Sequence, residues 1–272
     1  MNIYILCGGY YDNFPYPKAL TRINGEALLD RTLRLLSKYD TETFVCCNQN
    51  EDAFNDYNYL RCNFTFNYLK QTGYYLDIFD GVEFDTECIF LFGDVYYTEE
   101  AISKIIDKYN NTIRNIFICN NYPFNEQHLR QGEPFGWIVK DVEIFKNAIK
   151  LCKSFQDRGI IDHANGIPSN WELAHIINGL GVNEFNLNKE DCLVIDDLTI
   201  DIDDPSAIEK LENKLGWNIV LFWVFFKRCF NKRCFIAPLF LCDKWSSWNL
   251  YLYKHLLHLY ICFCHDDIRY QN

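Results

Sequence analysis

Short apolar runs alternate with segments of helical periodicity along residues 1–215 of the chain. A continuous apolar run is typical of a parallel strand that is covered on both faces. These runs predict strands at residues 3–7, 43–47, 88–95, 115–119, 184–187 and 192–195, with a partly exposed one at 64–68. Helices are predicted at residues 27–36, 101–109, 142–152, 170–178 and 207–215. The alternation of the two predicts an α/β fold with right-handed crossovers.

A glycine pair ends the first predicted strand. Gly8 and Gly9 follow the apolar run, and Lys18 comes nine residues after the second glycine. Glycine lets the backbone approach a ligand closely, and successive N–H groups after a strand form a cradle for phosphate. Lys18 could neutralise a phosphate on the far side of that cradle. The alternative is a turn that serves tight packing alone, and the glycine pair does not decide between the two.

Carboxylates occupy two further positions of interest. Asp94 lies at the carboxyl end of the strand at 88–95, and ligands of open α/β sheets bind outside the carboxyl ends of strands. In the extended stretch 199–204, alternation places Asp201 and Asp203 on one side. Hard oxygen ligands of this kind suit Mg²⁺. The alternatives are a helix N-cap at Asp94 and a solvated cap at 201–204, in front of a helix with Pro205 at its first position.

Several motifs together resemble a known family. They are Leu6-Cys7-Gly8-Gly9, Pro17-Lys18-Ala19-Leu20, Asn24-Gly25 and Leu28-Leu29-Asp30-Arg31-Thr32-Leu33. This combination resembles the opening of the MobA-like NTP transferases, which activate sugar phosphates and related small phosphates. The glycine-to-lysine distance is similar to that of the short-loop branch, which includes molybdenum-cofactor guanylyltransferase and several cytidylyltransferases. The resemblance covers about residues 1–215 and implies a Rossmann-like three-layer α/β/α fold of the glycosyltransferase A type, with a mixed, mainly parallel sheet.

The resemblance also implies roles for individual residues. Asp94 and Asp201 match the two carboxylates that hold Mg²⁺ in the family, while Asp203 is expected to be structural or to lie outside the metal's own ligands. Lys18 is the expected catalytic cation. The implied nucleotide-binding residues are Leu6, Cys7, Gly8, Gly9, Lys18, Gln71, Thr72 and Gly73.

Two segments carry open alternatives. The loop at Gln71-Thr72-Gly73 matches the family's contact to base and ribose, but it could equally be an N-cap and turn before a helix that carries Leu76, Phe79 and Val82. Residues 133–139 interrupt the alternation of strand and helix, and the resemblance implies a crossover to a substrate lid there. Trp137 and Trp171 could contact a substrate, although core packing is the favoured alternative.

The chain departs from the family at one position. The family usually carries an arginine that helps to hold the triphosphate four residues past the second glycine, and Asn13 stands there. Arg22 is a candidate replacement. A non-catalytic nucleotide-binding protein is therefore one alternative function. A glycosyltransferase of the same fold is another, although such enzymes usually carry Asp-x-Asp where this chain has Gly93-Asp94-Val95-Tyr96.

Composition narrows the class further. The net charge is −11 and 49% of the residues are hydrophobic, which favours a well-packed core and argues against general nucleic-acid binding. Thirteen cysteines show no paired C-x-x-C spacing, so we expect reduced thiols and no zinc site. Met1-Asn2 leads into the first strand without a basic segment, which favours a cytoplasmic protein.

The pattern changes abruptly at Trp217. Residues 219–226 are apolar, and basic pairs and aromatic–cysteine clusters follow as far as Cys264. We therefore expect a catalytic domain at 1–216 and an extension at 217–272. The apolar run is too short to span a bilayer. Three alternatives remain open for it: an interfacial membrane anchor, a packing extension over the core or an oligomer face, and a stretch without selected function, such as a shifted reading frame. A homodimer is a possible assembly.

These observations predict a Mg²⁺-dependent nucleotidyltransferase. It would transfer NMP from an NTP, with CTP favoured, to a phosphorylated sugar or small alcohol and release pyrophosphate. By analogy, the product would be an activated precursor for surface polysaccharide or lipid.

Overall fold

The computed structural model describes residues 1–8, 14, 17–47, 52–55, 57, 73–79, 82–120, 132–162, 164–184, 187 and 189–216. The chain divides into two units, Met1–Lys214 and Leu215–Asn272, and the elements below lie in the first of them, apart from the end of the last helix. The expected strand at 64–68 and the extension at 217–272 lie outside the described residues. The domain division predicted at residue 216 stays a prediction.

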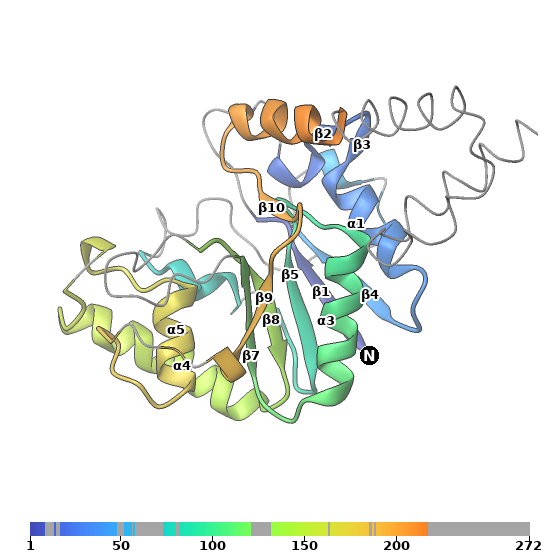
Figure 1. The fold of residues 1–272 in the computed structure, drawn as a ribbon. Helices are drawn as coiled ribbons and strands as arrows, with labels where there is room; N and C mark the ends of the chain where they lie inside the picture. Colours follow the sequence, from blue (N-terminus) through green and yellow to red (C-terminus); the bar gives the residue numbers. More distant parts are fainter. Residues whose placement is uncertain are drawn as a thin grey trace, which may run out of the picture. The chain divides into compact units, whose positions relative to one another are not determined.

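A six-stranded sheet forms the centre of the described structure (Figure 1). The strand β8 runs antiparallel to both of its neighbours, and the remaining neighbours in the sheet pair in parallel. The prediction of a mixed, mainly parallel sheet is therefore confirmed. The spatial order is β4 (Glu42–Cys46), β1 (Asn2–Leu6), β5 (Cys88–Phe92), β8 (Pro134–Val139), β7 (Ile116–Asn120) and β9 (Cys192–Ile195).

Helices cover both faces of this sheet, as the three-layer prediction requires. Figure 1 shows α1 (Leu28–Leu36) and α3 (Glu99–Asn111) on one face, with α4 (Val142–Asp157) and α5 (Asn170–Ile177) on the other. Local capping fixes where several of them begin. The Thr98 side chain accepts a hydrogen bond from the amide of Ala101 at the start of α3, which satisfies a donor that the helix itself leaves free.

Two small antiparallel ribbons and several short helices complete the described structure. One ribbon pairs β2 (Arg22–Ile23) with β3 (Glu26–Ala27), and the other pairs β6 (Val95–Tyr96) with β10 (Ile200–Asp201). Residues 205–216 form a further helix, and Asp204 accepts a hydrogen bond from the amide of Ser206 in front of it. The 3₁₀ helices are η1 (Lys18–Leu20), η2 (Asp52–Phe54), η3 (Tyr75–Ile78), η4 (Ala164–Gly166) and η5 (Lys189–Asp191).

Aromatic side chains fill the core beneath β5. The ring of Phe90 stacks 6.0 Å from that of Phe145 on α4 and meets Phe79 edge-on at 5.2 Å. Trp137 on β8 is completely buried. Because a Cβ at Gly136 would lie 2.1 Å from the Phe90 carbonyl oxygen, a larger residue would push β8 away from β5.

The structure corrects three expectations about secondary structure. Residues 134–139 do not cross over to a lid, because they form the antiparallel strand β8 inside the sheet. Trp137 therefore packs in the core. The helix expected after Gly73 is the single short turn η3, although Leu76, Phe79 and Val82 are all buried. Residues 184 and 187, the described ends of another expected strand, are not in a strand.

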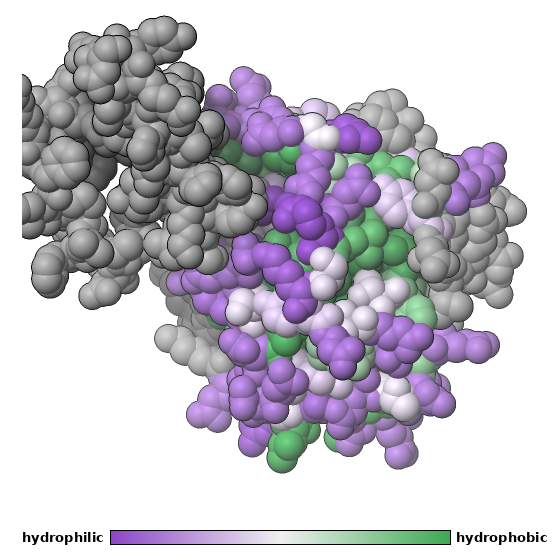
Figure 2. Space-filling model, turned by 90° about the vertical axis from the view of Figure 1, so that its right-hand side faces the viewer, coloured by the Kyte–Doolittle hydropathy of each residue, from purple (hydrophilic) through white to green (hydrophobic). Residues whose placement is uncertain are grey.

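The surface of the described residues is mainly polar. Figure 2 shows one face, on which hydrophilic residues surround apolar ones near the middle. Large hydrophobic side chains with high exposure among the described residues are Ile113, Ile144 and Leu151. None of the described helices is long and apolar enough to cross a membrane.

Candidate active site

Lys18, the first residue of η1, lies in a group of carboxylates. Its Nζ atom is 2.8 Å from Asp94 Oδ2, 3.0 Å from Asp203 Oδ1 and 4.0 Å from Asp201 Oδ1. We call these four residues the lysine cluster. Only 1% of the Lys18 side chain is exposed. Burial lowers the pKa of Lys18, but attraction to the three carboxylates outweighs burial and raises the pKa above its usual value. The ammonium therefore stays charged.

The position of Asp94 is set by close packing between the turn that follows β5 and the turn that follows β1. Asp94 lies between β5 and β6, and the preceding Gly93 amide donates to the Leu6 carbonyl at the end of β1 over 2.9 Å. A Cβ at Gly93 would lie 2.6 Å from Cys7 Sγ. Glycine at this position thus lets the turn that carries Asp94 pack directly on the turn that follows β1.

The second ribbon brings Asp201 to the same place. β10 runs antiparallel to β6, with Asp201 opposite Val95, and the Ile202 amide donates to the Asp94 carbonyl over 3.1 Å. Beyond the far end of this ribbon, Thr98 Oγ1 donates to Asp197 Oδ2 over 2.6 Å. The ribbon is thus held at both ends, and its backbone pairing sets Asp94 beside Asp201.

Glu133 is a neighbour of the lysine cluster that the sequence did not indicate. Its Oε2 atom accepts hydrogen bonds from the Asp201 amide at 3.2 Å and from Asn120 Nδ2 at 3.0 Å. The Glu133 amide in turn donates to Asn120 Oδ1 over 2.7 Å. Glu133 precedes β8, and because β8 runs antiparallel, its beginning lies at the same sheet edge as the carboxyl ends of the parallel strands. The sequence carries no signal of that direction.

The electrostatics of the lysine cluster favour an additional cation. Burial, and after it the charge of Asp94, raises the pKa of Asp201 well above its usual range, while Lys18 acts in the opposite direction. Burial also raises the pKa of Glu133. Within the described part of the chain, Asp201 Oδ1 is buried without a hydrogen-bond partner. A buried acceptor in this state gains free energy from any cation that reaches it.

The donor set agrees with a divalent cation of the Mg²⁺ type. Asp94 and Asp201 offer hard carboxylate oxygens, and Mg²⁺ is usually held by one or two protein carboxylates together with substrate phosphates and water. Among the described residues, no group of three or more His, Cys, Asp or Glu side chains forms a metal cage of its own. The residues therefore fit a cation that arrives with a phosphate ligand.

Residues 6–8 are the described part of the glycine turn. Leu6 and Cys7 are buried, and the Cys7 amide donates to the Cys46 carbonyl over 2.7 Å, so this N–H belongs to the strand pairing. Burial raises the pKa of the Cys7 thiol well above its usual value, which keeps the thiol protonated. Gly8 is buried at the end of this described segment, and Gly9 and Asn13 lie outside the described residues.

Gly73 is the described member of the expected base-binding loop, and Gln71 and Thr72 lie outside the described residues. Gly73 has a φ of +78°, which favours glycine. Its carbonyl accepts a hydrogen bond from Gln156 Nε2 of α4 over 2.6 Å. The end of α4 therefore holds the start of η3 in place.

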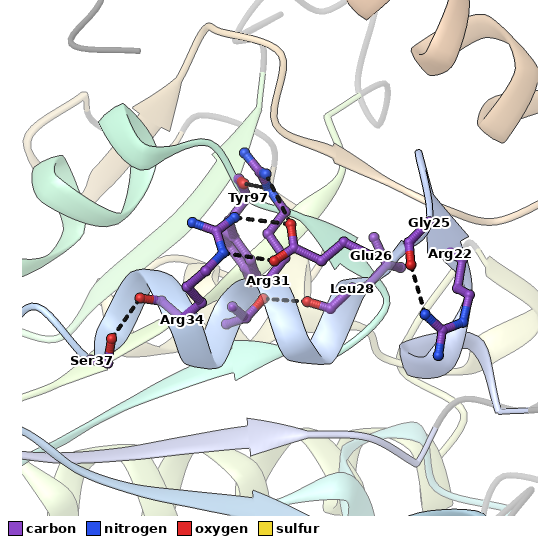
Figure 3. Close-up of polar contacts among 9 residues, drawn as sticks. Arg22, Gly25, Glu26, Leu28, Arg31, Arg34, Ser37 and Tyr97 are labelled. Carbon is purple, nitrogen blue, oxygen red and sulfur yellow. Dashed lines mark hydrogen bonds and ion pairs between the residues drawn. The ribbon is translucent and has the colours of Figure 1, made fainter. Parts of the chain in front are cut away.

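Arg22 is tied to its own hairpin. Its guanidinium is exposed and donates to the Gly25 carbonyl over 2.6 Å (Figure 3). Figure 3 also shows Arg31 and Arg34 of α1 converging on the carboxylate of Glu26. The guanidinium of Arg22 thus stabilises the β2–β3 turn, and this contact gives no support to Arg22 as the replacement for the missing loop arginine.

The fold and the clustered charges together define a class of protein. A mixed α/β/α sandwich with a lysine and carboxylates at the carboxyl ends of its central strands is the arrangement of Rossmann-like nucleotidyltransferases. Residues 3–141, just over half of the chain, match the MobA-like NTP transferase domain, and the chain belongs to this family. The prediction of a nucleotidyltransferase enzyme is therefore confirmed.

Solved structures give distant similarities. A UDP-glucose pyrophosphorylase from Acinetobacter baumannii is 11% identical, with a TM-score of 0.48 over 85% of this chain and 98% of that one. A 2-C-methyl-D-erythritol 4-phosphate cytidylyltransferase from Thermus thermophilus is 11% identical, with a TM-score of 0.43 over 78% and 97%. These similarities are too distant to bear on substrate. No curated protein sequence matches the chain significantly.

Proposed function

We propose that this chain transfers NMP from an NTP to a phosphorylated sugar or small alcohol in a Mg²⁺-dependent reaction that releases pyrophosphate. The observation that carries the proposal is the convergence of Lys18, Asp94 and Asp201 from distant parts of the sequence. CTP is the favoured donor because the glycine-to-lysine distance is similar to that of the short-loop branch of the family. Surface polysaccharide or lipid synthesis is the proposed setting by analogy.

In this proposal each residue has a separate task. Gly8 and Gly9 let the backbone approach the triphosphate. Asp94 and Asp201 would hold Mg²⁺, which when bound supplies charge neutralisation at the phosphates. The Lys18 ammonium lies beside Asp94 and Asp201 and would balance negative charge on the α- and β-phosphates. Gln71, Thr72 and Gly73 would contact the base and ribose.

The reaction itself needs no covalent contribution from the protein. A phosphate oxygen of the acceptor attacks the α-phosphorus of the NTP, the bond between that phosphorus and the bridging oxygen breaks, and pyrophosphate leaves with the electron pair. Because the reactants supply both the nucleophile and the leaving group, the residues contribute by positioning and by charge stabilisation. Lys18 suits this purpose, because the neighbouring carboxylates raise the pKa of its buried ammonium above the usual value and the reaction asks no proton transfer of it.

Pyrophosphate release tests the proposal. The wild-type protein is incubated with Mg²⁺, each of the four NTPs, and a panel of sugar 1-phosphates, phosphocholine and related acceptors. We expect release with one NTP above the others. Asp94→Ala should lower the rate by about 10²–10³-fold, because an electrostatic stabiliser of the transition state is lost. Asp196→Ala is the matched control, since Asp196 is exposed and pairs with Lys104.

Three outcomes would contradict the proposal. Unchanged turnover in a folded Asp94→Ala protein would remove Asp94 from the site. Turnover of a nucleotide sugar, without use of any NTP, would favour the glycosyltransferase alternative. Binding of an NTP without pyrophosphate release on any acceptor would favour a non-catalytic nucleotide-binding protein. The cytoplasmic location, a homodimer and membrane contact through 217–272 stay predictions.

A further inference from the structure

Lys18 is directed at carboxylates, although its proposed task is to contact phosphate. Its ammonium forms close pairs with Asp94 and Asp203, and its side chain is almost completely buried. A buried ammonium is stable only when carboxylates surround it. The partner Asp203 lies 185 residues away in the sequence and is more than half exposed. The protein therefore holds a positive charge in place among the same oxygens that suit a metal.

Two cations cannot use these oxygens equally well at the same time. Asp94 Oδ2 accepts a short, charge-assisted contact from Lys18 Nζ at 2.8 Å. A Mg²⁺ ion needs its ligand oxygens at about 2.0–2.1 Å and in near-octahedral geometry, and it would repel an ammonium held beside it. Asp201 Oδ1, at 4.0 Å from Nζ, is paired only loosely. Lysine has a flexible four-carbon stem, so its ammonium can move while the backbone of η1 stays in place.

We propose that Lys18 is the resident counter-cation of Asp94, Asp201 and Asp203, and that a divalent cation competes with its ammonium for these carboxylates. The metal alone therefore binds weakly. When a nucleoside triphosphate arrives, its phosphates attract the Lys18 ammonium and release the carboxylates, so metal and nucleotide bind as a unit. The part that concerns the nucleotide rests on the proposed function, whereas the competition between the two cations does not.

Binding of Mn²⁺ in the absence of nucleotide tests the competition. Free Mn²⁺ is measured by electron paramagnetic resonance in titrations of the wild-type protein and of Lys18→Met. Removal of the competing charge should tighten Mn²⁺ binding by about tenfold or more, because a unit charge a few ångströms away strongly opposes a divalent ion. Lys104→Met is the matched control: it removes the same charge from pairs with Glu100 and Asp196 on the α3 side of the sheet, and its Mn²⁺ affinity should stay unchanged. Unchanged or weaker Mn²⁺ binding by a folded Lys18→Met protein would overturn the proposal.

A measurement on the wild-type protein avoids any dependence on the folding of Lys18→Met. A buried, ion-paired ammonium exchanges its protons slowly, so Lys18 should give a ¹H–¹⁵N signal in protein labelled at lysine. Titration with Mg²⁺ should broaden or shift this signal in step with metal binding, whereas an unperturbed signal at saturating Mg²⁺ would overturn the proposal. Cation competition without any NTP turnover would leave the competition standing and remove the proposed function, together with the part of the inference that concerns the nucleotide. Turnover without competition would do the reverse.

Discussion

Two clusters of charged side chains include residues from the first 34 positions of the chain, and they differ in the sign of the charge that is in excess. In the lysine cluster, one ammonium faces Asp94, Asp201 and Asp203. In what we call the arginine cluster, Arg31 and Arg34 of α1 share the carboxylate of Glu26 (Figure 3). The first cluster gathers residues distant in sequence, whereas the ion pairs of the second join residues that are at most eight positions apart in the sequence.

The two clusters also differ in how completely their polar atoms are paired. Arg34 binds both oxygens of Glu26, at 2.7 and 2.9 Å. Arg31 Nε donates to the Tyr97 carbonyl over 2.8 Å, and its guanidinium lies 4.2 Å from the ring centroid of Tyr96. By contrast, Asp201 Oδ1 is buried without a hydrogen bond among the described residues. The arginine cluster is complete by itself, while the lysine cluster has negative charge left for a ligand. Excess of unpaired charge therefore distinguishes a candidate binding site from a structural ion pair.

Asp201→Asn should show the largest difference between the two clusters, because it should lower activity and not stability. We expect pyrophosphate release to fall by about 10²–10³-fold, because a carboxylate proposed to hold the metal is lost. The free energy of unfolding should stay the same or rise, since the change removes a buried charge beside Asp94. Chemical denaturation and the pyrophosphate assay measure the two quantities. Loss of stability together with retained activity would show that Asp201 serves the fold instead.

Arg31→Met should give the opposite result. Only 11% of the Arg31 side chain is exposed, and methionine keeps the apolar stem while removing the hydrogen bond to Tyr97. We expect a loss of about 2 kcal/mol in the free energy of unfolding, in line with hydrogen bonds to charged groups. The rate at saturating substrate should change by no more than a few-fold. A rate loss as large as that of Asp201→Asn, with stability unchanged, would mean that the arginine cluster belongs to the active site.

The smallest effect is expected for Glu26→Gln and should depend on pH. Hydrogen bonding from Arg34 lowers the pKa of Glu26 in the folded protein, although partial burial opposes this. A lowered carboxyl pKa stabilises the folded state above the unfolded pKa, and that contribution is lost as the pH falls through the folded pKa. Near neutral pH, the free energy of unfolding of the wild type should be about 0.2–1 kcal/mol larger than that of Glu26→Gln, as for a partly exposed ion pair. Chemical denaturation at a series of pH values measures this difference. A difference that persists in strong acid, where the carboxyl is protonated in both states, would contradict this assignment.

The sequence by itself determined the local elements and one half of the site. Continuous apolar runs predicted the central strands β1, β5 and β7, which are buried along almost their whole length, and they also predicted the partly buried edge strands β4 and β9. A run of this kind can be read from consecutive residues alone. The positions of Gly8 and Asp94 at strand ends followed from the same local reasoning, and Lys18 was singled out by its distance from the glycines and by the family resemblance. The helix start near Pro205 was likewise predictable, since capping depends on adjacent residues.

Only the tertiary structure decided which charges meet. The antiparallel insertion of β8 carries Glu133 to the lysine cluster, and nothing in the local sequence indicates the direction of a strand. Asp203 was expected to be structural or to lie outside the metal's own ligands, and only the fold shows that it pairs closely with Lys18. Arg22 was a candidate for the site, yet it binds the Gly25 carbonyl of its own hairpin. Apolar pattern and capping act over a few residues, whereas the partner of a charge depends on which distant segments the sheet places side by side.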